Sequence, residues 1–142
     1  MTFKPPFKIG QIVMNADIVS TFKVGNMGGM RRSLKTNSLV LIMDHTKGFY
    51  KDKYKEKEIH YIGMGKYGDQ KLDRQNKTLF ESDKNNVNVY FFEVFHPTEY
   101  TYRGRVKLAK FPYQEEQLDV EGNLRKVRVF PLKVVSDRLL RI

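Results

Sequence analysis

The residues from Val87 to Phe95, VNVYFFEVF, constrain the fold more than any other stretch of this sequence. They are rich in valine, tyrosine and phenylalanine, which favour β-strands, and no glycine or proline interrupts them. Four more segments are predicted as strands: residues 38–43, 59–64, 100–110 and 126–134. Only short helices are predicted, at residues 15–22 with Asn15 as the N-cap, 75–82 and 136–142. We therefore expect a mostly β (α+β) domain, a twisted β-barrel with short flanking helices.

The net charge narrows the class of partner. The 142 residues fit a single domain, residues 1–142, with one continuous core. Lys and Arg outnumber Asp and Glu by 26 to 16, which gives a formal charge of +10. A basic surface favours a polyanionic partner, because neutralising phosphates releases counterions. The composition therefore favours nucleic acid, and a basic protein without such a partner is the alternative.

Several kinds of site and location are disfavoured. The sequence has no cysteine, which excludes disulfides and thiolate metal sites and fits a reducing compartment, so we expect a cytoplasmic protein. No apolar run approaches the ~18 residues that a membrane span needs, and the first residues lack a signal-peptide core. His45, His60 and His96 do not have metal-ligand spacing, so neither a metal nor another cofactor is expected.

The motif GMGKYG, from Gly63 to Gly68, matches the spacing of a dinucleotide-binding loop, but its context does not. The residues that follow, DQKLDRQNK, lack the apolar stripe of a helix that packs on a parallel sheet. We interpret the glycines as a tight loop that lets a ligand approach the backbone. Because no complete nuclease or serine–histidine–aspartate arrangement is recognisable, the chain is predicted to be a binding module, not an enzyme.

Residues 49–76, around this loop, concentrate aromatic and polar side chains, including Phe49, Tyr50, Asp52 and Tyr61. Aromatic rings can stack on a nucleobase, and a carboxylate can accept hydrogen bonds from its exocyclic amine. One hypothesis is therefore a pocket for a base turned out of DNA. The other hypothesis places Tyr61 in the core and Asp52 in a turn among lysines, and composition alone slightly favours it.

Basic side chains follow a pattern of their own near the C-terminus. Alternation along residues 100–110 predicts one strand face with Arg103, Arg105 and Lys107 and an opposite, apolar face with Tyr102, Val106 and Leu108. A solvated outer face and a face that follows DNA phosphates explain this pattern equally well.

The order of motifs resembles a known family. Residues 38–79 resemble the central part of SRA (SET- and RING-associated) domains, the PUA-like readers of methylated cytosine. They are more similar still to the SRA-like domains of bacterial modification-dependent (type IV) HNH restriction endonucleases and related helicases. A strand, an acidic loop, a Tyr-x-Gly strand end, Gly-Asp-Gln and Asn-(Lys/Arg)-x-Leu follow in the family's order. The tail at residues 100–134 is also similar, so that the resemblance covers about residues 9–135.

The resemblance implies a PUA/SRA-like fold and a role for each matching residue. SRA domains hold a flipped, modified cytosine between two aromatic rings, while an aspartate reads its amino edge. By position, Tyr61 and Phe49 match the rings, with Tyr50 one register step from Phe49, and Asp52 matches the reader. Backbone groups of Ile62 and Gly63 complete the implied base pocket. The remaining expected DNA contacts include Met27, Met30, Arg31 and Arg32, which belong to a separate flexible loop at residues 24–33 that is also rich in glycine. The others are Lys66, Arg103, Arg105 and Lys107.

The resemblance also implies a function. We expect the chain to bind duplex DNA that contains a 5-methyl- or 5-hydroxymethyl-type cytosine, as the recognition module of a bacterial or phage-defence restriction system. A nuclease or helicase domain is expected in cis or in trans, and no membrane partner is expected. The segment after the glycine-rich turn is too short for the insertion with which eukaryotic members read the opposite strand, so a preference for hemimethylated sites is not expected. An RNA-binding PUA-like domain and a small nuclease or base-processing enzyme are the alternatives.

Overall fold

The computed structural model describes residues 3–46, 53–55 and 58–135, and within these ranges it contains nine strands and two short helices. The strands are β1 (Ile12–Val13), β2 (Met30–Ser33), β3 (Ser38–Asp44), β4 (Lys53–Lys55), β5 (Glu58–Ile62), β6 (Asn88–His96), β7 (Glu99–Leu108), β8 (Tyr113–Leu118) and β9 (Leu124–Val135). The helices are α1 (Asn15–Phe22) and α2 (Arg74–Phe80). Neither helix is long enough to cross a bilayer, and no other helix occurs in the described ranges.

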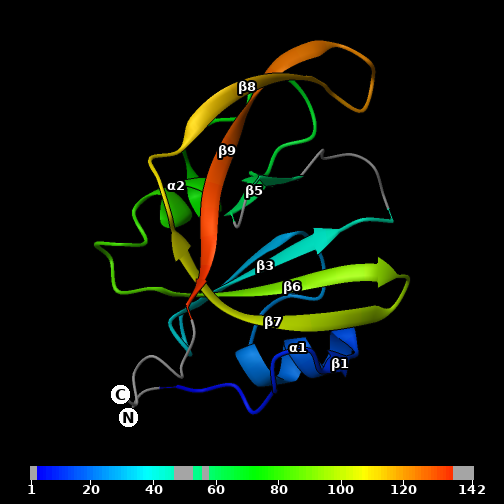
Figure 1. Cartoon of the computed structure of the whole chain (residues 1–142), viewed down its shortest axis with the longest axis vertical. Coiled ribbons are helices and arrows are strands. Elements are labelled where there is room, and N and C mark those ends of the chain that lie inside the picture. Colours follow the sequence, from blue (N-terminus) through cyan, green and yellow to red (C-terminus); the bar gives the residue numbers. More distant parts are fainter. Residues whose placement is uncertain (1–2, 47–52, 56–57, 136–142) are drawn as a thin grey trace.

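All nine strands belong to one mixed sheet with the order β2-β3-β6-β7-β9-β5-β4. β3 and β6 are parallel, and the other pairs are antiparallel. β1 pairs with the start of β7, and β8 pairs with the start of β9. The long strand β9 joins the two halves, so that the sheet curls into a half-barrel with β8 and β9 rising as a hairpin (Figure 1).

The predicted mostly β fold is confirmed, and each of the five predicted strands corresponds to an observed one, namely β3, β5, β6, β7 and β9. The two predicted helices inside the described ranges are also observed. The helix predicted at residues 136–142 lies outside the described residues. The prediction that Asn15 is the N-cap of α1 is wrong, because Asn15 is the first residue of the helix. The cap is Met14, whose backbone N–H donates to the Asp17 carboxylate (2.8 Å).

The core has two main parts, one on each face of the sheet. One part lies inside the half-barrel and includes Leu41, Phe91, Tyr61 and Phe130, which come from β3, β6, β5 and β9. The other part lies under α1 and includes Ile18, Phe22, Val40, Tyr90 and Phe92. Because successive side chains of a strand point to opposite faces, β3 and β6 contribute to both parts, and apolar residues make up most of each strand.

The predicted single basic face of β7 is wrong, because β7 contains a bulge. Phe91 pairs with Gly104 but Phe92 pairs with Tyr102, which leaves Arg103 as an extra residue. Arg105 pairs with Tyr90 and therefore lies on the α1 face, whereas Arg103 reaches Glu93 on the other face. The burial of Tyr102 in the α1 part of the core and of Val106 in the other part follows from the same shift.

Candidate nucleic-acid interface

A cavity of about 510 Å³ lies where a loop, the end of β3 and the end of β5 meet. Its lining includes Tyr61, Ile62 and Gly63 of the predicted base pocket. It also includes four of the predicted DNA contacts, Met27, Met30, Arg31 and Lys66. A second hollow, of about 660 Å³, lies between the end of α2 and residues 108–112 and contains none of the predicted site residues. The fold therefore gathers residues from four separate segments, the fourth being represented by Tyr100, around the first cavity.

Tyr61 belongs to the cavity wall and to the core at the same time. Its side chain is buried, and its ring meets Phe91 edge to face with centroids 6.5 Å apart. Its hydroxyl donates hydrogen bonds to the backbone oxygens of Gly29 (2.8 Å) and Ile42 (3.2 Å). The two sequence-based interpretations of Tyr61, a core residue and a pocket residue, are thus compatible in the structure.

The glycine-rich loop at residues 63–68 is held by buried polar side chains whose role the sequence did not indicate. The Gln70 amide nitrogen donates to the oxygens of Gly63 (2.7 Å) and Gly65 (3.1 Å). The Asn76 side chain binds the backbone of Met64 through both its oxygen and its nitrogen. Arg125 donates to the oxygens of Gly65 and Gly68 from strand β9. Gln70 and Asn76 stand in the Gly-Asp-Gln and Asn-(Lys/Arg)-x-Leu motifs, and that position was the only sequence signal for them.

Asp119 supports the same region from the turn of the β8–β9 hairpin. Its carboxylate accepts hydrogen bonds from the backbone N–H groups of Asn123 (2.9 Å), Glu121 (2.9 Å) and Gly68 (3.5 Å). These bonds, with that of Asn123 contributing most, lower the pKa of Asp119, and the nearby charge of Arg125 adds to the effect. The hairpin turn and the glycine-rich loop are therefore joined through one ionised carboxylate.

The second loop at the cavity, residues 26–29, is called the Met27 loop below. Met27 is 81% exposed, whereas Met30 and Arg31, directly after the loop, are buried. The Arg31 guanidinium donates to the Gly28 oxygen (2.9 Å) and to the Asn15 side-chain oxygen (2.6 Å). Of the predicted contacts in this segment, only Met27 is thus presented openly to a partner.

The other predicted site residues have varied surroundings. Arg32 is half-buried at the β2–β3 turn, where it donates to the oxygens of Ser33 and Ser38, and burial lowers the pKa of its guanidinium. Lys66 is exposed at the cavity, Lys107 is exposed on β7, and Arg105 is half-buried. Phe49, Tyr50 and Asp52 lie outside the described residues.

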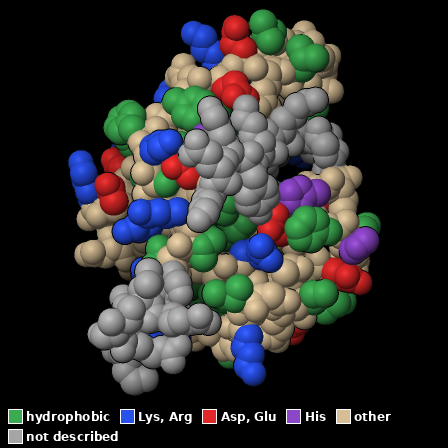
Figure 2. Space-filling model, in the orientation of Figure 1, with side chains coloured by type: hydrophobic (Ala, Val, Ile, Leu, Met, Phe, Trp, Pro, Cys, Tyr) green, Lys and Arg blue, Asp and Glu red, His purple; other side chains and the backbone are tan. Residues whose placement is uncertain are grey.

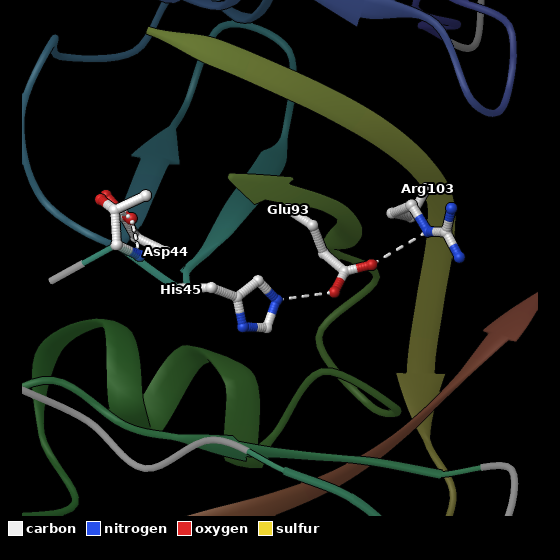
Figure 3. A network of polar contacts seen from close by, with 5 residues as sticks. Asp44, His45, Glu93 and Arg103 are labelled. Atoms are coloured by element: carbon white, nitrogen blue, oxygen red, sulfur yellow. Dashed lines mark hydrogen bonds and ion pairs between the residues drawn. The ribbon is translucent and has the colours of Figure 1, made fainter. Parts of the chain in front are cut away.

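Arg103 takes part in a polar network on the inner face of the half-barrel. Glu93 is almost completely buried and lies between His45 and Arg103 (Figure 3). One oxygen of Glu93 is 2.9 Å from His45 Nε2, and the other accepts from Arg103 Nε at 3.1 Å. Asp44, which lines the cavity, instead accepts hydrogen bonds from Thr46. Arg103 is therefore held in place by a buried carboxylate while its side chain stays 45% exposed.

Charged side chains are dispersed over the face seen in Figure 2, where Lys and Arg alternate with acidic and hydrophobic groups. On this face the Lys and Arg side chains are therefore not collected into one basic patch. Among the residues that the structure describes, no group of three His, Asp or Glu side chains is arranged to hold a metal ion.

Solved structures of ScoMcrA share the fold of this chain. No curated protein matches the chain. The sulfur-binding and SRA domains of ScoMcrA, complexed with phosphorothioated DNA, match with a TM-score of 0.75 and 16% identity over 91% of this chain and 40% of that chain. The type IV phosphorothioation-dependent restriction endonuclease ScoMcrA matches with a TM-score of 0.73 and 17% identity over 91% of this chain and 28% of that one. The chain thus spans less than half the length of these two structures.

A plant-type match covers both chains almost fully. The SUVH5 SRA domain in complex with hemimethylated CG DNA has a TM-score of 0.66 and 18% identity, and the match covers 92% of this chain and 90% of that chain. At these identities the solved structures establish the fold. The family is established by the model for the "ScoMcrA-like, SRA domain", which matches residues 9–140. The resemblance to SRA domains is confirmed, and this chain belongs to the ScoMcrA-like SRA domain family.

Proposed function

We propose that this chain binds duplex DNA that carries a modified cytosine and holds that base, flipped out of the helix, in the cavity beside Tyr61. The cavity is the observation that carries the proposal. It has a volume of about 510 Å³, and the aromatic residue Tyr61 lies in its wall beside Ile62 and Gly63. The exposed side chains of Met27 and Lys66 lie at the same cavity, where they can meet the DNA.

The reading of the base is assigned to residues outside the described ranges. We propose that Phe49, with Tyr50 beside it, provides the second ring, and that Asp52 accepts hydrogen bonds from the exocyclic amine of cytosine. An ionised carboxylate only accepts hydrogen bonds, and cytosine offers a donor where thymine offers a carbonyl oxygen. Asp52 would therefore distinguish cytosine derivatives from thymine.

The chain acts, on this proposal, as the recognition module of a modification-dependent restriction system. ScoMcrA is a type IV restriction endonuclease, and this chain matches only part of it. Cleavage or translocation would therefore reside in a nuclease or helicase domain, in cis or in trans.

Competition binding tests the proposed function. A labelled duplex with one 5-methylcytosine is bound to the chain and competed with duplexes that differ only at that base: cytosine, 5-methylcytosine, 5-hydroxymethylcytosine or thymine. Further competitors are the same duplex with one phosphorothioate linkage, its separate strands and a structured RNA. A modified-cytosine duplex should compete at least tenfold better than plain cytosine.

Each other outcome points to a different function. Preference for the phosphorothioate duplex would mean that the chain recognises a modified DNA backbone and not a modified base. Preference for RNA would support the RNA-binding alternative, and turnover of any competitor would support an enzyme. Equal competition by all duplexes would contradict the proposal.

A single substitution tests the proposed reader. Asp52→Asn keeps the size of the side chain but adds a hydrogen-bond donor, so it should weaken binding to the modified-cytosine duplex. The difference in binding free energy between the modified-cytosine and thymine duplexes should decrease by about 1–3 kcal/mol. The measurement is the dissociation constant of wild type and variant on duplexes with 5-methylcytosine or thymine at one position. An unchanged gap would show that Asp52 does not read the base.

A further inference from the structure

The Met27 loop is fixed by hydrogen bonds at three of its four backbone carbonyls. Asn15 of α1 donates from its side-chain nitrogen to the Asn26 oxygen (3.0 Å), and Arg31 donates to the Gly28 oxygen (2.9 Å). Tyr61 of β5 donates from its hydroxyl to the Gly29 oxygen (2.8 Å). Side chains from a helix, from β2 and from β5 thus hold one short loop.

These three side chains also depend on one another. The Asn15 oxygen accepts a hydrogen bond from Arg31 (2.6 Å), so the amide of Asn15 connects the buried guanidinium to the loop. Arg31 is only 5% exposed, and a buried guanidinium requires such partners because its desolvation is costly. The buried Arg31 guanidinium is thus used for hydrogen bonds within the protein, to Gly28 and Asn15.

Gly29 makes the close approach of Tyr61 possible. A Cβ atom at Gly29 would lie 3.3 Å from the Tyr61 hydroxyl oxygen and 3.4 Å from the Ile42 oxygen, closer than most side-chain contacts. The Gly29 oxygen also accepts from the Ile42 backbone N–H (2.7 Å). The loop is therefore joined both to the edge of β3 and to the tyrosine that lines the cavity.

We propose that Tyr61, Arg31 and Asn15 are positioning residues that couple the base cavity to the Met27 loop. Tyr61 belongs to the wall of the cavity and holds the loop with its hydroxyl, so a base bound in this cavity meets a residue that also fixes the Met27 loop. The inference rests on the proposed function. It takes Met27 as the DNA contact that the proposed function expects, and it assigns to the three positioning residues the task of holding the Met27 loop at the cavity.

A double-mutant cycle between Tyr61→Phe and Met27→Ala tests this coupling. Tyr61→Phe keeps the ring but removes the hydroxyl, so it should weaken binding to a 5-methylcytosine duplex roughly two- to tenfold, the effect of one hydrogen bond. In the Met27→Ala protein the same change should have almost no further effect, because the loop no longer carries the side chain to be placed. Equal losses in the two backgrounds would overturn the coupling.

Two controls match the exposure of the substituted residues. Tyr90→Phe removes a hydroxyl from an equally buried tyrosine in the core under α1, and Leu34→Ala truncates a side chain as exposed as Met27. Both should leave DNA binding unchanged. Asn15→Ala reaches the loop from α1 and should show the same non-additivity with Met27→Ala, so the inference stays testable if Tyr61→Phe lowers the melting temperature.

Fluorescence separates this inference from the proposed function. A 2-aminopurine placed next to the modified cytosine brightens when the neighbouring base leaves the stack. If wild type neither brightens it nor prefers the modified duplex, the proposed function fails, and the coupling fails with it. If wild type does both but the cycle is additive, the proposed function stands and only the coupling is overturned.

Discussion

Gly63 lines the cavity and packs closely against Asn76, which holds the glycine-rich loop at residues 63–68. A Cβ atom at this position would lie 2.5 Å from the Asn76 side-chain oxygen and 3.1 Å from a ring carbon of Phe130. Asn76 needs that space, because its oxygen accepts from the Met64 N–H at 2.8 Å and its nitrogen donates to the Met64 and Lys71 oxygens. The absence of a side chain at Gly63 therefore allows Asn76 to fix the start of the glycine-rich loop.

Gly63→Ala should consequently destabilise the protein by about 1–3 kcal/mol, the usual cost of overpacking. The measurement is the free energy of unfolding in urea. Gly25→Ala is the matched control, because a Cβ there meets no atom within 4 Å. Equal stability of the two variants would contradict the described packing around Gly63.

Asp119 gives the protein a defined dependence on acid. Its pKa is lower in the folded protein than the ordinary value of about 3.9, so the ionised form stabilises the fold above that pH. The contribution is lost as the pH falls from about 4 through the lowered pKa. We expect Asp119→Asn to melt earlier than wild type at pH 7 and the difference to shrink below pH 4.

Thermal unfolding followed from pH 7 to pH 3 measures this effect. Asp83→Asn is the control, because Asp83 is exposed and makes no hydrogen bond or ion pair with the described residues. A constant difference between wild type and Asp119→Asn over the whole range would show that the charge of Asp119 does not support the hairpin turn.

At the scale of elements, the bulge in β7 shows what an alternating pattern leaves undetermined. Residues 100–110 alternate as a regular strand would, but the extra residue Arg103 exchanges the faces on its two sides, and the next residue, Gly104, has a φ of +107°. The sequence contains a glycine there, which is compatible with a bulge but does not require one. The pairing with β6 determines the position of the bulge, and it brings Arg103 to the buried carboxylate of Glu93.

Arg103→Ala should therefore reduce stability as well as any DNA contact. It leaves Glu93 buried with His45 as its remaining ion-pair partner among the described residues, at a cost of about 1–3 kcal/mol. Adding Glu93→Gln removes the buried charge and should restore part of the loss. Lys107→Ala, on the same strand but exposed, should leave the free energy of unfolding unchanged. A loss that Glu93→Gln does not reduce would contradict the network.

Strands β2 and β8 were not predicted, because neither shows an apolar alternation. β8 reads YQEEQL and is exposed along most of its length, so no apolar alternation marks it. β2 reads MRRS, and two arginines beside glycines predicted a loop. Arg31 is nevertheless buried, because Asn15 and Gly28 satisfy its guanidinium. These partners are a side chain of α1 and a backbone oxygen of the Met27 loop, and the hydrophobic periodicity of the sequence does not indicate either contact.

At the scale of the whole molecule, the fold class was predictable from the sequence, whereas the contacts that hold the walls of the cavity were not. Apolar strands and the order of motifs predicted the mostly β fold, and they placed Tyr61, Ile62 and Gly63 in the proposed base pocket. The support by Gln70, Asn76, Arg125 and Asp119 depends on contacts between residues up to 60 positions apart. The net charge of +10 indicated a polyanionic partner, although the positive charges are dispersed over the face seen in Figure 2.

Base flipping is the central claim, and its energetic signature can be measured directly. A protein that extrudes a base must break its pairing, and this costs less when the base is already mispaired. The measurement is the dissociation constant for two duplexes that differ only in placing guanine or adenine opposite one 5-methylcytosine. Moving the mispair five base pairs away provides the control for general flexibility. We predict tighter binding when the mispair is at the modified base and no gain when it is moved. Equal affinity for the paired and the mispaired 5-methylcytosine would contradict the account.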